Sequence, residues 1–173
     1  MTPLRILMLS PVFPAPQNTG TRVRLHNILR CLHDQGHELG FISFVTPEED
    51  PWIKDVAPLF ADMRLVPINR SSGVLAKMRR LCRALPHLLR GMPPLAAFAD
   101  HKDIRNALLA LAPRYDVLCV EFYFMASNVP STLLTAHKPL SVLVEHDLSF
   151  VPLQRRARLM GGVGGAAARF AGR

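Results

Sequence analysis

The chain has 173 residues, of which 49% are hydrophobic and 20% are charged, and its formal net charge is +8. This length predicts one domain of ordinary size, and the hydrophobic content argues against a disordered chain. No uncharged apolar run approaches the roughly 18 residues of a membrane-spanning helix, and the first apolar run is too short for a signal peptide, so we expect a cytoplasmic protein.

The N-terminal part of the chain predicts a strand, a helix and a second strand. Residues 4–9 form a short apolar run, which is typical of a strand buried on both faces of a parallel sheet. A loop with three prolines follows and ends at Gly20. An amphipathic helix should then end before Gly36, and residues 39–45 form another apolar strand. The helix is indicated by apolar residues at helical spacing, namely Leu25, Ile28, Leu29 and Leu32.

The middle of the chain predicts one short strand and two helices. The strand covers residues 63–66, after an acidic stretch that is broken by prolines. Apolar residues at helical spacing predict a helix over residues 74–89, which Pro86 should kink or end. A second helix should be capped by Asp100 and Asp103 and should end at Pro113.

Two further apolar runs, residues 116–122 and 141–144, predict two more buried strands. The second of them delivers Glu145, His146 and Asp147 at its carboxyl end. Strands that alternate with helices predict an α/β fold with a Rossmann-like, doubly wound parallel sheet.

The cysteines predict neither a disulfide framework nor a zinc site. Cys31, Cys82 and Cys119 are odd in number and widely spaced, and each lies in an apolar periodic segment. We therefore expect reduced thiols in the core and no metal.

In an open parallel sheet, ligands bind outside the carboxyl ends of the strands. Gly20 has no Cβ, so a phosphate could approach the backbone amides that open the first helix, where Arg22 and Arg24 lie in the first turn. The alternative is a plain turn glycine. The patterns GxGxxG and GxxxxGK[ST] are absent, which disfavours a Rossmann dehydrogenase or a P-loop enzyme.

His146 is the histidine best placed for chemistry, because a carboxylate on each side would raise its basicity and orient it. The alternative is a histidine that only satisfies a loop. Glu121 ends its strand in a similar way, and its alternative role is that of a capping or salt-bridged carboxylate. No Ser/His/Asp arrangement or metal-ligand spacing is present.

Basic residues gather in two parts of the chain, with six between Arg70 and Arg90 and five from Leu148 to the end. Neither part contains an acidic residue. This pattern suggests a polyanionic partner. The helix over residues 74–89 could lie at an anionic membrane surface, or it could pack its apolar stripe on the sheet with its arginines in water.

Residues 14–39 follow the pattern PxPxxxGxRxRxxxxxxCLxxxGHEL, which resembles the opening of the family 4 glycosyltransferases of the GT-B fold. In that family a proline- and glycine-bearing loop precedes an arginine-bearing helix, and a Gly-His-Glu turn, here Gly36 to Glu38, leads into the second strand. Residues 115–117 (Tyr-Asp-Val) begin one buried strand and residues 145–147 (Glu-His-Asp) follow another, and the family places similar residues at these two points. The resemblance covers roughly residues 4–160.

The resemblance implies the retaining transfer of a sugar from a nucleotide-sugar donor to an acceptor, in a cleft between two Rossmann-like domains. It implies that the Gly20 loop lies against the donor diphosphate and the acceptor and that His146 contacts the transferred sugar. Many relatives have paired glycines where this chain has Thr19 and Gly20. Thr19, Gly20, Arg24, Glu121 and Asp147 are the expected substrate-binding residues, and no cofactor is expected besides the donor substrate.

We therefore expect residues 1–160 to form the acceptor-side N-terminal half of a GT-B architecture, followed by a Gly/Arg-rich tail over residues 161–173. The C-terminal donor-binding domain of the family is not found in this chain, so the enzyme would need a partner chain or be incomplete. Expected partners are a nucleotide sugar, a carbohydrate or lipid-linked acceptor, and an anionic surface at the inner face of the plasma membrane. The alternative is a non-catalytic Rossmann-like module that binds phosphorylated ligands or anionic membrane. Nucleic acid is not expected, because basic and aromatic residues are not interleaved.

Overall fold

Five parallel strands form the centre of the computed structural model, which describes residues 2–68, 78, 81–82, 85–87, 89–90, 94–135 and 139–145. The strands of this described part are β1 (Arg5–Ser10), β2 (Glu38–Val45), β3 (Asp62–Pro67), β4 (Val117–Glu121) and β5 (Leu140–Val144). The α-helices are α1 (Gly20–Asp34), α2 (Ile53–Val56), α4 (Pro94–Ala99), α5 (Lys102–Leu111) and α6 (Ser131–Leu134). Short 3-10 helices are η1 (Pro47–Trp52), η2 (Ala57–Leu59), η3 (Ala112–Arg114) and η4 (Tyr123–Asn128).

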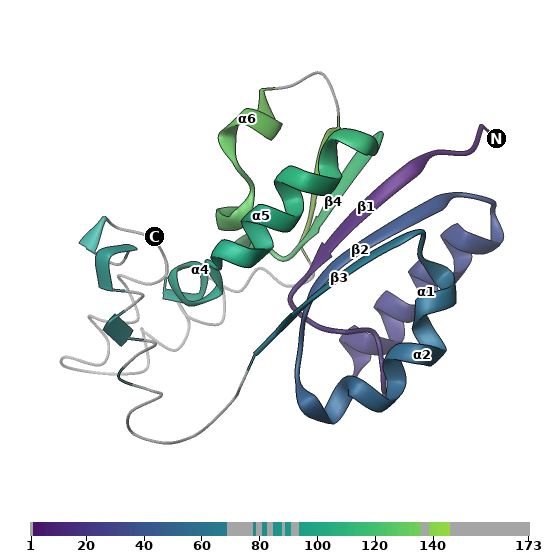
Figure 1. Cartoon of the computed structure of the whole chain (residues 1–173), viewed down its shortest axis with the longest axis horizontal. Helices are drawn as coiled ribbons and strands as arrows, with labels where there is room; N and C mark the ends of the chain where they lie inside the picture. Colours follow the sequence, from purple (N-terminus) through teal and green to yellow (C-terminus); the bar gives the residue numbers. More distant parts are fainter. Residues whose placement is uncertain are drawn as a thin grey trace, which may run out of the picture.

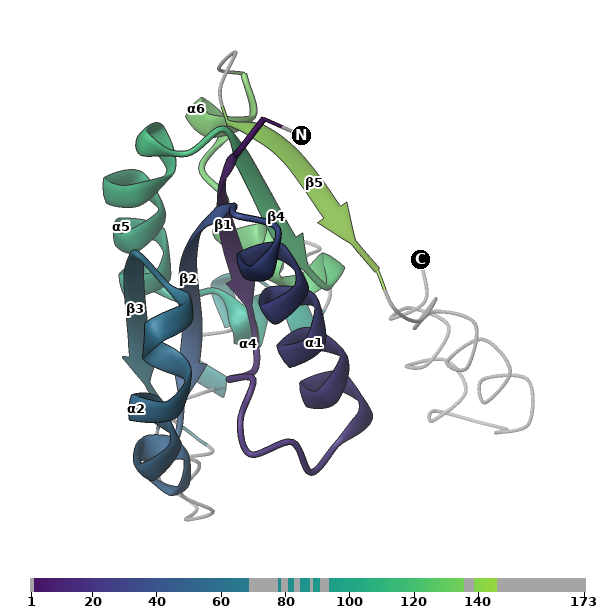
Figure 2. The same cartoon turned by 90° about the vertical axis from the view of Figure 1, so that its right-hand side faces the viewer.

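The strand order is β3-β2-β1-β4-β5, and every neighbouring pair is parallel. Figures 1 and 2 show α1 and α2 on one face of the sheet and α4, α5 and α6 on the other. The predicted Rossmann-like, doubly wound sheet is therefore confirmed. Each of the five predicted strands lies within two residues of the observed one.

The sheet is buried on both faces, which explains why its strands are nearly continuous apolar runs. Successive residues of β1 point to opposite faces, so Ile6 and Met8 pack with α1 while Leu7 and Leu9 pack with α5. The α1 layer is anchored by Leu25 and Leu29, which are fully buried. The α5 layer is anchored by three apolar residues at helical spacing, namely Ile104, Leu108 and Leu111.

The Gly-His-Glu turn of the sequence pattern has a structural role in this fold. Gly36 has a φ of +83°, a left-handed conformation that favours glycine, and it ends the turn that follows α1. The backbone N–H of His37 donates to the carbonyl of Leu32 at 3.1 Å, and the His37 Nδ1 accepts from the N–H of Leu4 at 3.1 Å. The turn therefore ties the end of α1 to the start of β1.

A polar cluster links the amino ends of the strands. The hydroxyl of Tyr115 donates to Asp62 Oδ2 at 2.9 Å, and Arg114 Nη2 lies 2.9 Å from the same oxygen. Burial alone would raise the pKa of Asp62, but the hydrogen bonds from Tyr115 and Arg114 outweigh it and the pKa is lowered. Burial and the bond to Asp62 raise the pKa of Tyr115. Next to this cluster, Arg5 Nη2 lies 3.3 Å from Asp116 Oδ1, and this contact raises the pKa of Arg5.

Two local predictions were wrong. The N-cap of α5 is His101, whose Nδ1 accepts from the N–H of Asp103 at 3.3 Å, because the carboxylate of Asp100 is engaged by other side chains. No disulfide joins the cysteines, and Cys119 is half-buried and packs against the core on the α1 side, but Cys31 and Cys82 are exposed rather than in the core. Cys31 lies off the stripe of α1 that faces the sheet.

The predicted helix over residues 74–89 is described only in part, and the described residues are helical, Pro86 included. Its described apolar residues do not pack on the sheet: Met78, Leu81, Leu85 and Leu89 are all exposed. Among the helices that the structure describes, none is long and apolar enough to span a membrane. Residues 146–173, including the Gly/Arg-rich tail, lie outside the described residues.

Candidate functional site at the carboxyl edge of the sheet

The candidate site lies where β1 and β4 end side by side. From β1 the chain adds β2 and β3 on one side of β1, and it then adds β4 and β5 on the other side. The strand order therefore switches direction between β1 and β4. Leu9 is paired with Val120, which sets Ser10 beside Glu121 at the carboxyl edge. Open α/β sheets bind ligands at such a switch point.

The N-terminus of α1 faces this edge and is open to a ligand. Thr19 is the N-cap, and its side chain accepts from the N–H of Arg22 at 3.4 Å. A Cβ added to Gly20 would meet no atom within 4 Å, and the first turn contains no acidic residue. The backbone amides and the helix dipole at this end therefore favour an anion.

Arg24 and Glu121, both predicted as binding residues, form an ion pair across the switch point. Arg24 Nη1 donates to Glu121 Oε2 at 3.1 Å, which joins α1 to the end of β4. The Glu121 side chain is only 3% exposed, whereas that of Arg24 is 39% exposed. The pair thus holds a guanidinium at the surface of the edge by means of a buried carboxylate.

A second ion pair beside α1 was not predicted from the sequence. Arg22 donates to Glu49 Oε1, and Glu49 Oε2 accepts from the N–H of Thr46 at 2.7 Å and from its hydroxyl at 3.2 Å. Glu49 is buried although it belongs to an acidic, proline-broken stretch. The signal that could have found it is the capping box Thr-x-x-Glu at Thr46 to Glu49, which begins η1.

The chain turns sharply after Glu121. Phe122 has a φ of +68°, and its N–H donates to the carbonyl of Val144 at 2.8 Å. A non-glycine residue in this region is strained, and such residues cluster at functional sites. The turn places the N–H of Tyr123 2.9 Å from Glu145 Oε2, and burial and the charge of Glu145 raise the pKa of Tyr123.

Glu145 is the last described residue at the end of β5, and it faces the end of β4. Its second oxygen, Oε1, is buried without a hydrogen-bond partner. The predicted residues His146 and Asp147 lie directly after it and fall outside the described residues. Of the predicted site residues, the structure therefore brings Thr19, Gly20, Arg24 and Glu121 to one edge.

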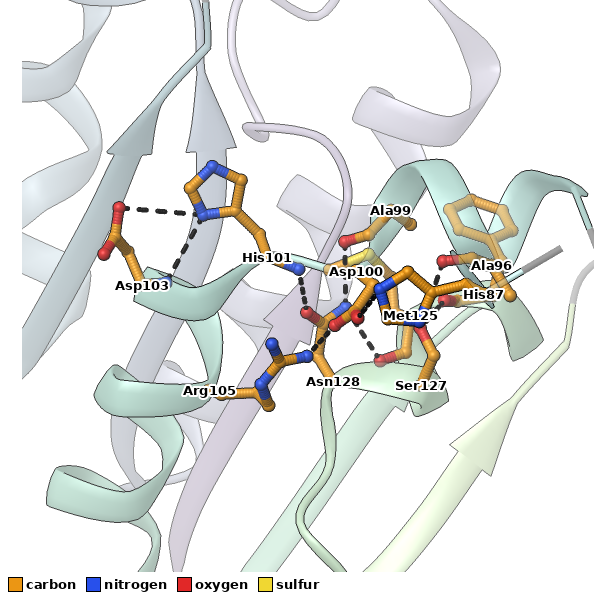
Figure 3. A network of polar contacts seen from close by, with 11 residues as sticks. His87, Ala96, Ala99, Asp100, His101, Asp103, Arg105, Met125, Ser127 and Asn128 are labelled. Atoms are coloured by element: carbon orange, nitrogen blue, oxygen red, sulfur yellow. Dashed lines mark hydrogen bonds and ion pairs between the residues drawn. The ribbon is translucent and has the colours of Figure 1, made fainter. Parts of the chain in front are cut away.

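A further polar network lies on the other face of the sheet, at the N-terminal end of α5 (Figure 3). The buried Asp100 accepts from Arg105 through Oδ1, and His87 Nε2 lies 3.2 Å from its Oδ2. The fully buried Asn128 accepts from the N–H of His101 at 2.8 Å and donates to the carbonyl of Ala99 at 3.0 Å. These bonds join α4, α5 and η4. No group of three metal-ligating side chains occurs in the described ranges.

No family model and no curated protein matches this chain. Two solved structures resemble it. The C-terminal domain of a hydrogenase from Pyrococcus furiosus is 14% identical with a TM-score of 0.46, and the match covers 82% of this chain and 90% of that domain. The glycotransferase of kitacinnamycin is 16% identical with a TM-score of 0.43, and the match covers 96% of this chain but 38% of that protein. These values assign the chain to no family.

Proposed function

We propose that this chain supplies the acceptor-side domain of a retaining glycosyltransferase with a GT-B architecture. The observation that carries the proposal is the Arg24–Glu121 pair at the β1/β4 switch point, next to the open N-terminus of α1. The resemblance of residues 14–39 to family 4 glycosyltransferases is the reason for proposing sugar transfer as the reaction. The substrates would be a nucleotide sugar and a carbohydrate or lipid-linked acceptor.

The donor diphosphate would meet the backbone amides that begin at Gly20. Arg22 and Arg24 are each fixed by a buried carboxylate, so their guanidinium groups would be ordered before the ligand arrives. The planar guanidinium group suits the recognition of phosphate oxygens. Such preorganisation lowers the entropy cost of binding.

His146 and Asp147 would contact the transferred sugar in this proposal. Glu145 would position them, since its carboxylate is held by the backbone of Tyr123 at the end of β4. Groups on a second domain, in the same or a partner chain, would complete the cleft. The 173-residue chain alone should therefore transfer no sugar, because half of a catalytic constellation loses most of its positioning.

The test is binding of nucleotide sugars to the purified chain by titration calorimetry and amide-shift mapping. A panel of uridine, guanosine and thymidine diphosphate sugars would be compared with inorganic diphosphate. We expect nucleotide sugars to bind more tightly than inorganic diphosphate through contacts with the sugar, whichever base they carry, and to shift amides around Gly20 and Glu121. Glu121→Gln and Arg24→Gln should weaken binding at least tenfold.

The matched control is Arg30→Gln, which removes the same charge from the exposed, distal part of α1. It should leave affinity within twofold. Equal affinity for diphosphate and for every nucleotide sugar would instead indicate a module that binds phosphorylated ligands. Amide shifts confined to regions away from the β1/β4 edge, or robust glycosyl transfer by the chain alone, would overturn the proposal.

A further inference from the structure

Three consecutive aromatic residues follow β4 at the carboxyl edge of the sheet. They are Phe122, Tyr123 and Phe124, and each is half-buried, so part of each residue reaches solvent. The rings of Phe122 and Phe124 stack, with centroids 5.4 Å apart and an interplanar angle of 23°. The ring of Tyr123 meets Phe124 edge to face, with centroids 5.6 Å apart. We call these three residues the aromatic turn.

The backbone of the aromatic turn is strained at its first residue. The φ of Phe122 is +68°, a left-handed conformation that glycine adopts readily and a phenylalanine does not. Two hydrogen bonds fix this conformation. The N–H of Phe122 donates to the carbonyl of Val144 at 2.8 Å, and its carbonyl accepts from the N–H of Met125 at 3.0 Å. The backbone alone would favour glycine here, so the reason for a phenylalanine lies in its ring.

One ring of the aromatic turn is anchored in the core. Phe124 packs against the cluster on the α5 side of the sheet, in which Met125 is fully buried. The two core clusters of the described part of the chain include neither Phe122 nor Tyr123. Phe124 therefore fixes the position of the other two rings, which contact it at the edge of the sheet.

A carboxylate oxygen without a partner lies beside the aromatic turn. Glu145 follows β5, which pairs with β4 along its whole length (Figure 2), and its Oε2 accepts from the N–H of Tyr123 at 2.9 Å. Its Oε1 is buried and has no hydrogen-bond partner. A buried acceptor without a donor is unfavourable, most of all when the group is charged. A hydroxyl group of a bound molecule would satisfy this oxygen.

Tyr123 adds a hydrogen-bond donor to the same place. Within the described ranges its hydroxyl bonds to no other residue. Burial and the charge of Glu145 raise the pKa of Tyr123, so the hydroxyl is protonated at neutral pH. The aromatic turn and Glu145 therefore bring together apolar rings, an acceptor oxygen and a donor hydroxyl. Ligand sites of small molecules combine aromatic side chains with a few polar groups in this way.

We propose that the aromatic turn and Glu145 bind a sugar ring. The C–H bonds on one face of a pyranose are polarised by the neighbouring oxygens, and they are attracted to the negative face of an aromatic ring. Hydroxyl groups of the same sugar donate to Glu145 Oε1 and accept from the Tyr123 hydroxyl. An organic cation also suits aromatic rings beside a carboxylate. The guanidinium of Arg24, 39% exposed at the end of the same strand, disfavours a cation by charge repulsion.

This sugar is the acceptor in the proposed function. Phe122 directly follows Glu121, whose carboxylate is paired with Arg24. A sugar on the aromatic turn therefore lies next to the place proposed for the donor diphosphate at Gly20 and Arg24. The identification of the sugar as the acceptor rests on the proposed function, whereas the binding of a sugar ring does not.

The test is binding of simple glycosides to the purified chain, measured by saturation-transfer NMR and amide-shift mapping. The probes are the methyl β-glycosides of glucose, galactose, mannose and N-acetylglucosamine. Glycerol is the control that has hydroxyl groups but no ring face. We expect at least one glycoside to bind and to shift the amides of Tyr123 and Glu145. Glycerol and inorganic diphosphate should not shift them.

Two variants test the ring and the carboxylate separately. Phe122→Gly removes one ring and relieves the strained φ, so the circular dichroism spectrum should be unchanged while glycoside affinity falls at least fivefold. Glu145→Gln replaces an acceptor oxygen with an amide nitrogen and should weaken binding at least tenfold. The matched controls are Trp52→Leu, at an aromatic residue 43% exposed elsewhere, and Asp34→Asn, at an exposed carboxylate at the far end of α1. Both should leave affinity within twofold.

Unshifted Tyr123 and Glu145 amides with every glycoside would overturn the proposal, as would unchanged affinity in both variants. Tighter binding of tetramethylammonium than of any glycoside would show a cation site instead. The test of the proposed function uses nucleotide sugars with Gly20 and Arg24, so the two failures are distinguishable. Nucleotide-sugar binding without glycoside binding counts against the sugar site alone. Glycoside binding without nucleotide-sugar binding supports the sugar site and counts against the transferase.

Discussion

Gly40→Ala should destabilise the domain strongly although it adds one methyl group. Gly40 lies in β2, and a Cβ there would be 2.4 Å from the Tyr115 hydroxyl oxygen, 2.5 Å from Tyr115 Cζ and 2.9 Å from Leu7 Cδ1. Side chains do not approach a Cβ this closely, so the ring must move. Tyr115 is 2% exposed and has little room to do so.

The cost has two parts. Forcing an extra methyl group into a well-packed core costs about 1–3 kcal/mol. Displacing the ring also breaks the 2.9 Å bond from the Tyr115 hydroxyl to Asp62, and a hydrogen bond to a charged group is worth about 1.5–3 kcal/mol. Together these losses amount to about 2.5–6 kcal/mol, a large share of the ~5–15 kcal/mol that stabilises a typical domain.

The assay is urea unfolding followed by far-ultraviolet circular dichroism, applied to Gly40→Ala, Tyr115→Phe and the double variant. In the Tyr115→Phe background the hydrogen bond is already absent, so Gly40→Ala should cost only about 1–3 kcal/mol for the remaining collision with the ring. A free energy of unfolding within about 0.5 kcal/mol of the parent for Gly40→Ala, or strictly additive effects in the double variant, would refute this reasoning.

Three further predictions concern the candidate site and the amino edge. Gly20→Ala should leave the urea midpoint unchanged, because the added Cβ meets nothing, while Gly20→Val should weaken nucleotide-sugar binding measured by calorimetry. The pKa of Tyr115 is raised, so the unfolded chain loses this proton first and Tm should fall as pH rises above about 10. The pKa of Asp62 is lowered, so the unfolded chain gains this proton first and Tm should also fall as pH drops below about 3.9. Tyr115→Phe should reduce the alkaline loss, to which Tyr123 also contributes through its own raised pKa, and an unreduced loss would place the cause elsewhere. His146→Ala should reduce turnover of the assembled enzyme with little change in its free energy of unfolding, and unchanged kinetics would remove His146 from the site.

The strands and α1 could be predicted because burial on both sheet faces and on one helix face leaves direct periodic signals in the sequence. The short helices left no such signal: α2 and α6 have four residues each, about one turn. Leu81, Leu85 and Leu89 have the spacing of a buried stripe but are exposed, and periodicity does not tell which environment a stripe faces. Tertiary structure decided that point.

The residues of the candidate site could be found one at a time but not as pairs. Arg24 and Glu121 are 97 positions apart, and only the parallel pairing of β1 with β4 brings them together. Glu49 was hidden because an acidic run with prolines looks like an exposed loop. The capping box of Thr46 and Glu49 marks Glu49 locally as a helix cap, but its pairing with Arg22 of α1 is a tertiary contact that this local pattern does not contain.

The paired carboxylates are more deeply buried at the carboxyl edge of the sheet than at the amino edge. At the carboxyl edge Glu121, Glu49 and Asp100 have side chains 3%, 5% and 4% exposed, and each is paired with an arginine. At the amino edge Asp116 and Asp62 are 19% and 22% exposed. Stripping water from a charge is expensive, and an apolar pair of similar volume is often as stable or more stable by about 1–4 kcal/mol. Fold stability alone therefore does not account for the buried pairs at the carboxyl edge.

Replacing one such pair as a unit separates stability from function. Arg24→Leu with Glu121→Leu removes both charges together, so neither is left buried alone, and the free energy of unfolding should stay equal to the parent's or rise. Binding of the nucleotide sugar should be lost, since an ordered guanidinium no longer faces the ligand at the switch point. Urea unfolding and calorimetry on one preparation measure both quantities. A double variant that unfolds more easily yet binds as the parent does would show that the pair stabilises the fold. The substrate would then not bind at this pair on the carboxyl edge.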